Sequence, residues 1–170
     1  MRGGSFMPLP TKLKNKKAVL NIQNRDKQCL RWALRAALFP APRGRNPVRP
    51  SSYPTEDGLN FIGIDFPTPV SQIDRLERQN QNLAINVFGW ENGQVAVHRI
   101  SEKGGEIPRI NLIITKQGEN THYSYAKRLT KHFHMTKTGT MKANISANAP
   151  CMDIKLEIFL KGTNQSAKGC

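Results

Sequence analysis

Cysteine, long apolar runs and acidic residues are all scarce in this sequence of 170 residues. Its three cysteines, Cys29, Cys151 and Cys170, are too few and too widely spaced for a disulfide framework, which favours a reducing, intracellular setting in the nucleus or the cytoplasm. No apolar run approaches the roughly 20 residues that a membrane-spanning helix needs. The first ten residues carry Gly and Pro where a secretory signal has its apolar region, so we expect no such signal.

Acidic residues number 12 against 26 lysines and arginines, which gives a net charge of +14. Residues 1–60 carry +9, residues 61–130 carry +1 and residues 131–170 carry +4, so the excess lies at the two ends. Basic ends are typical of chains that bind a polyanion such as nucleic acid, and equally of a solvated arm. No membrane partner is expected. The candidate nucleic-acid-binding residues are Lys12, Lys14, Lys16, Lys17, Arg43 and Arg45.

The hydrophobic pattern predicts an α+β fold, in which an N-terminal helix packs on an antiparallel sheet of about four strands. Residues 29–39 place their apolar side chains on one helical stripe, which ends before Pro40. Residues 18–23 predict a short strand and residues 70–79 a short amphipathic helix. The sheet strands are expected at residues 83–90, 94–100, 109–115 and 121–129, with a hairpin turn at Asn92-Gly93.

Composition divides the chain into three parts. Residues 1–17 form a basic lead-in, rich in Gly, Pro and Lys, without a hydrophobic period. Residues 18–130 form the α+β domain. Residues 131–170 form a polar tail, expected to be either a degenerate zinc finger or disordered.

One cysteine and one histidine stand in the order that papain-like cysteine hydrolases use. Cys29 opens the predicted helix, where free backbone amides and the helix dipole stabilise a thiolate. His122 opens a predicted strand, from which its imidazole could accept the thiol proton. Gln23 and Asn24 precede the cysteine and could donate to an oxyanion. The alternative is a buried structural thiol and a strand histidine bonded to backbone, and the pattern does not choose among Asn144, Asn148 and Asp153 as a third member.

Motifs for other chemistry are missing. The chain has neither GxGxxG nor GxxxxGK[ST], so no phosphate-cradling loop and no cofactor are expected. His132 and His134, with Cys151 and Cys170, fit no standard zinc spacing, so no metal site is predicted.

Three blocks of the sequence carry a family resemblance. The first includes Pro8-Leu9-Pro10, Lys16-Lys17-Ala18, Asn21-Ile22, Asn24, Asp26, Cys29 and Trp32. The second spans residues 59–101, and the third joins residues 110–115 to His122-Tyr123 and the residues that follow. Together they resemble a domain of Maverick/Polinton DNA transposon proteins, over about residues 3–131. Arg128 departs from the family pattern, which carries Asn or Asp after the lysine.

This resemblance implies a fragment of a larger protein that lies with or near a protein-primed family B DNA polymerase. Residue order by itself predicts a papain-like cysteine hydrolase, a peptidase or deubiquitinase-like domain acting on a peptide or ubiquitin-like protein, and the resemblance implies that this domain derives from a transposon protein. If the position of Arg128 orients the histidine in the family, this copy is weakened or inactive. The alternative function is a basic DNA- or protein-binding module accessory to a replication enzyme.

Overall fold

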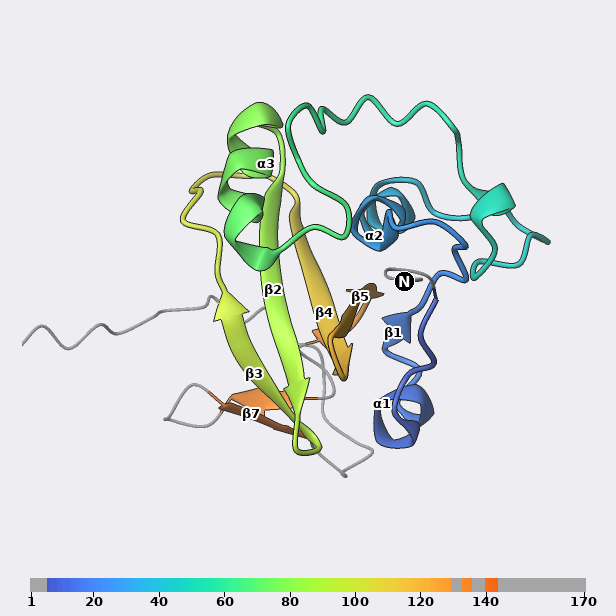
Figure 1. The fold of residues 1–170 in the computed structure, drawn as a ribbon, viewed down its shortest axis with the longest axis vertical. Helices are drawn as coiled ribbons and strands as arrows, with labels where there is room; N and C mark the ends of the chain where they lie inside the picture. Colours follow the sequence, from blue (N-terminus) through green and yellow to red (C-terminus); the bar gives the residue numbers. More distant parts are fainter. Residues whose placement is uncertain (1–5, 130–132, 136–139, 144–170) are drawn as a thin grey trace, which may run out of the picture.

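The computed structural model describes residues 6–129, 133–135 and 140–143, and these form the predicted α+β fold (Figure 1). Its helices and strands are, in chain order, α1 (Thr11–Asn15), β1 (Val19–Leu20), α2 (Cys29–Leu38), η1 (Pro50–Ser52), η2 (Val70–Gln72), α3 (Ile73–Gln79), β2 (Ala84–Glu91), β3 (Gln94–Arg99), β4 (Arg109–Gln117), β5 (Asn120–Ala126), β6 (Phe133–Met135) and β7 (Thr140–Ala143).

The strands form one mixed sheet in the order β1-β5-β4-β2-β3-β7-β6. The predicted hairpin joins β2 to β3, and its turn residues Asn92 and Gly93 have φ angles of 50° and 79°. In contrast to the expected antiparallel sheet, β4 pairs parallel with β2 and not with β3. Residues 100–108 return the chain to the starting end of β2, which places β4 inside the sheet between β5 and β2. A strand covered on both faces reads as a continuous apolar run, as β4 does.

Two helices cover one face of this sheet. Leu30 and Leu34 of α2 and Leu76 of α3 pack in one buried cluster with Ile85 of β2 and Leu112 of β4. α2 ends where Pro40 follows, since proline cannot supply the next helical amide. The cluster fixes both the start and the end of α2 relative to the sheet.

The short helix α1 covers the opposite face. Leu13 is fully buried, and it packs with Phe88, Ile113 and Leu129, while Leu9 adds a partly buried contact. Residues 6–17 are therefore part of the folded domain, whereas their composition predicts a separate lead-in. The apolar contacts come from Leu9, which precedes α1, and Leu13 within it, and two such residues are too few to give a visible period.

At the other edge of the sheet, β7 pairs with β3 through Val95 and Met141, and β6 pairs with β7. The sheet thus continues beyond the domain boundary expected at residue 130, because β3 offers an open edge to a further strand. Residues 144–170 of the expected tail lie outside the described residues. In the described part of the chain, no helix has the length and hydropathy needed to cross a bilayer.

Candidate functional site

Cys29 stands at the first position of α2, as the sequence predicts, but it is sealed from solvent. Its exposed fraction is 1%, and it belongs to the apolar cluster between α2 and the sheet. Burial raises the pKa of its thiol, and backbone hydrogen bonds at Tyr123 and Leu30 only partly oppose this effect. The expected stabilisation of a thiolate by the helix start is therefore outweighed by desolvation.

His122 lies within β5 and is completely buried. Its Nε2 lies 2.7 Å from Oδ1 of Asn21, which also accepts a bond of 3.2 Å from the Ser124 hydroxyl. Nδ2 of Asn21 donates to the Met7 carbonyl at 2.7 Å, which fixes the orientation of the amide. Nε2 of His122 consequently carries the proton, and burial lowers the pKa of the imidazole to about 4.

The structure does not bring Cys29 and His122 together. Successive residues of a strand point to opposite faces of the sheet. Tyr123 points to the α2 face, where it packs in one cluster with Cys29, so His122 points to the α1 face. Nε2 of His122 bonds to Asn21, and Nδ1 has no hydrogen-bond partner among the described residues. Neither ring nitrogen therefore bonds to the Cys29 thiol. The expected thiol–imidazole pair is not formed, since the sheet separates its members.

Gln23 and Asn24, which were expected to line an oxyanion hole, are both hydrogen-bonded within the fold. Gln23 is exposed, and its backbone amide donates to the Val48 carbonyl at 2.8 Å. Asn24 is buried, and its Nδ2 donates to the backbone and side-chain oxygens of Asp26. The Asp26 carboxylate in turn accepts from the backbone amide of Gln28 at the start of α2. The candidate third residues Asn144, Asn148 and Asp153 lie outside the described residues.

Most of the expected nucleic-acid-binding residues are exposed. Lys12 and Lys14 project from α1, and Lys17 follows it with a φ of 49°. Arg43 and Arg45 lie in the loop after α2. None of these five forms an ion pair within the described part of the chain. α1 lies over the sheet face opposite to α2, with Lys12 beside Gly93 in the β2–β3 turn, whereas the loop after α2 lies beyond the β1 edge (Figure 1).

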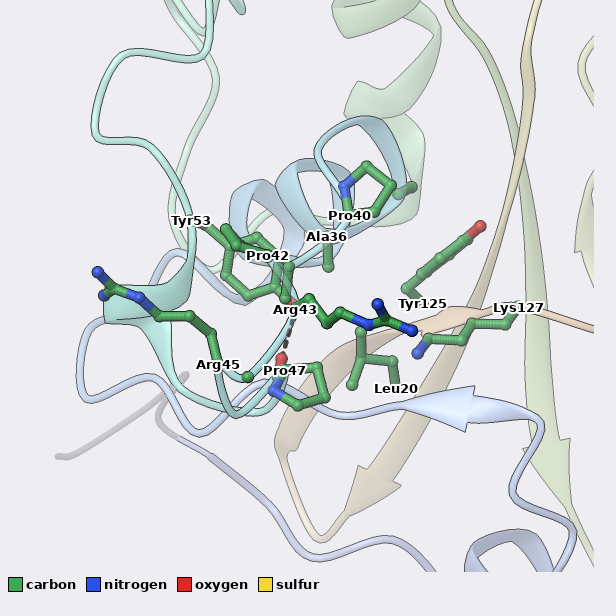
Figure 2. Close-up of a pocket in the computed structure, with 13 residues that line it drawn as sticks. Leu20, Ala36, Pro40, Pro42, Arg43, Arg45, Pro47, Tyr53, Tyr125 and Lys127 are labelled. Carbon is green, nitrogen blue, oxygen red and sulfur yellow. Dashed lines mark hydrogen bonds between the residues drawn. The ribbon is translucent and has the colours of Figure 1, made fainter.

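A pocket of about 510 Å³ opens beside this loop, between the end of α2, β1 and β5. Leu20 and Ala36 contribute apolar surface, Tyr125 contributes an aromatic side chain, and Arg43 points toward Lys127 at one side (Figure 2). Tyr125 and Lys127 are not among the residues that the sequence predicts for a site, although the alternation of the strand places Tyr125 on the α2 face.

Three arginines on the core side of the fold are neutralised by buried carboxylates. Nε of Arg31 and Nε of Arg35 lie 2.7 and 2.5 Å from Oδ2 of the buried Asp57. Burial alone would raise the pKa of Asp57, but the hydrogen bonds from the two arginines outweigh it and lower that pKa to about 2. Arg99 pairs in the same way with Glu77, Nη2 to Oε2, at 2.9 Å. Asp57 and Glu77 are thus the buried carboxylates of the described residues, and both are held by arginines.

Comparison of the chain with protein-family models, with curated proteins and with solved structures finds no match. Within residues 6–129, 133–135 and 140–143, no group of three or more His, Cys, Asp and Glu side chains could hold a metal ion.

Proposed function

We propose that this domain is a nucleic-acid-binding module that contacts the phosphate backbone through the basic surface along its β1 edge. The basic surface consists of Lys14, Lys17, Arg43 and Lys127. The observation that carries the proposal is that these four exposed cations form no ion pair with any described carboxylate. Unneutralised cations on one side of a protein attract a polyanion and release its counterions on binding.

Backbone contacts support the continuity of this surface. The amide of Lys127 donates to the Ala18 carbonyl at 2.8 Å, so Lys127 lies beside the residue that follows Lys17. Lys127 and Arg43 also line the same pocket. The cations of α1 are thereby linked through β1 and β5 to those of the loop after α2.

The positions of Cys29 and His122 favour binding over hydrolysis. A cysteine hydrolase needs an ionisable thiol within reach of an imidazole and of a substrate. The thiol here is 1% exposed and its neighbour from β5 is Tyr123. A binding module makes no such demand on these two residues.

The resemblance to Maverick/Polinton proteins supports DNA as the polyanion. In that setting the domain is an accessory to a replication enzyme, and its basic surface holds the template or product strand near the polymerase. This placement is part of the proposal and rests on the sequence blocks described above.

The test is fluorescence anisotropy with a labelled single-stranded DNA of about 16 nucleotides. We expect the double variant Lys14→Glu/Arg43→Glu to raise Kd by about tenfold or more, because two attractive phosphate contacts become repulsive. The charge-matched control is Arg75→Glu/Arg78→Glu on α3, where both arginines are exposed and the helix packs over β2. We expect this control to raise Kd by less than about twofold.

Equal weakening by the two double variants would show that net charge alone drives binding and would overturn the assigned surface. Failure of the unmodified protein to bind the DNA at low salt would overturn the proposed function itself.

A further inference from the structure

We infer that the pocket beside the loop after α2 accepts one unstacked base of a single strand, whose flanking phosphates are held by Arg43 and Lys127. This inference rests on the proposed function and deepens it, because it names single-stranded rather than duplex nucleic acid as the ligand. It assigns a binding role to a cavity that the basic surface alone does not explain.

The pocket combines the two surfaces that such a ligand needs. Its volume of about 510 Å³ lies within the usual range of small-molecule sites. Leu20, Ala36 and Tyr125 provide the apolar and aromatic surface on which a base can stack. Among the described residues, no acidic side chain contributes to its lining.

Two cations converge at the side of the pocket. The side chain of Arg43 points toward that of Lys127, and neither forms an ion pair with a described carboxylate (Figure 2). Two like charges directed at one place repel each other unless an anion lies between them. A phosphate bound there would bond to both groups and remove the repulsion.

The loop after α2, which forms the outer wall of the pocket, is held in place by its own hydrogen bonds. The Tyr53 hydroxyl donates to the Pro47 carbonyl at 2.5 Å, and the Ser52 hydroxyl donates to the Asn46 carbonyl at 2.6 Å. The amide of Arg45 closes a turn on the Pro42 carbonyl at 3.0 Å. Prolines and these bonds restrict the free loop, so binding costs little ordering entropy.

A base inside a duplex cannot enter this pocket, because it is paired and stacked between its neighbours. A base of a single strand can leave the stack and present its face to Tyr125 at a smaller cost. The pocket therefore distinguishes the two forms, whereas phosphate contacts alone would bind both.

The experiment compares three labelled ligands of equal length by anisotropy: single-stranded DNA, its duplex, and an abasic strand with the same phosphates. For Tyr125→Leu, which keeps apolar volume and removes the aromatic face, we expect Kd for the single strand to rise roughly 5- to 100-fold. Binding of the abasic strand should stay unchanged. Arg43→Ala/Lys127→Ala should weaken binding of both strands. The matched control is Phe39→Leu, an exposed aromatic outside the pocket lining, and it should change neither.

Two outcomes separate this inference from the proposed function. If the unmodified protein binds the single strand and the abasic strand equally, or Tyr125→Leu weakens both equally, the base pocket is refuted while phosphate binding stands. If it binds none of the three ligands, the proposed function fails as well.

A second measurement avoids any variant that fails to fold. The unmodified protein is cross-linked by ultraviolet light to a single strand containing 4-thiothymidine, and the modified peptides are mapped by mass spectrometry. Cross-links within residues 36–47 or at residues 125–127 support the pocket. Cross-links confined to other segments overturn it.

Discussion

The ring of His122 donates from Nε2 to Oδ1 of Asn21, 2.7 Å away, on the face of the sheet opposite to Cys29. This bond fixes the imidazole as a neutral, buried group that ties β5 to the chain just after β1. It accounts for a histidine in a position that the sequence order would assign to a catalytic base.

The first prediction concerns the pH dependence of stability. His122 has a pKa of about 4 in the folded state and about 6.5 in the unfolded state, so the unfolded chain binds more protons between these pH values. The contribution of His122 to the free energy of unfolding is therefore fully present above the pKa of the unfolded state, and it declines as pH falls toward the pKa of the folded state. We expect the free energy of unfolding, measured with urea, to drop by about 3 kcal/mol from this group between pH 7 and pH 4.

The control is His122→Gln, which lowers stability at every pH but removes the decline between pH 6.5 and 4 that belongs to this residue. An unchanged slope in this variant would show that His122 is not the buried neutral group described here.

A second prediction concerns thiol reactivity. Because Cys29 is buried and its pKa is raised, we expect its alkylation by iodoacetamide to be roughly 100-fold slower in the folded protein than in urea. Mass spectrometry separates its labelling from that of Cys151 and Cys170. Folded-state labelling as fast as that of a free cysteine, with loss of that rate in His122→Ala, would instead indicate an activated thiolate.

A third prediction concerns the buried carboxylate of Asp57. Asp57→Asn removes the negative charge shared by Arg31 and Arg35 and leaves a buried guanidinium without compensation. We expect the free energy of unfolding to fall by about 3–5 kcal/mol. The neighbouring exposed Glu56 supplies the control, since Glu56→Gln should cost less than about 0.5 kcal/mol. Equal effects of the two substitutions would contradict the buried bridge.

Local sequence signals predict the helices and strands well but not how the strands are ordered. The apolar stripe of α2, the Asn92-Gly93 turn and the alternation of β2 are all visible within a few residues. The parallel pairing of β2 with β4 depends on the path of the intervening residues 100–108, for which no local pattern exists. Leu13 of α1 and Leu9 before it are likewise too few to predict how this helix packs.

The predicted pair of Cys29 and His122 is not formed, because the next residue, Tyr123, is the one that faces Cys29. His122 and Tyr123 are adjacent, and the strand period of two decides which of them faces Cys29. Residue order along the chain contains no information about that phase, which is set by how β5 pairs with β1 and β4. The exposure of the basic residues was easier to predict, because burying a charged side chain costs free energy.

The most direct test of the account is the salt dependence of binding to a labelled single strand, measured between about 50 and 200 mM salt. With four phosphate contacts from the basic surface, the logarithm of the association constant should fall with the logarithm of salt concentration with a slope of roughly −3. Lys14→Glu/Arg43→Glu should make that slope shallower by roughly 1.4, and the α3 control should leave it unchanged. Binding that does not respond to salt, or no binding at the lowest concentration, would contradict the assignment of this surface to nucleic acid.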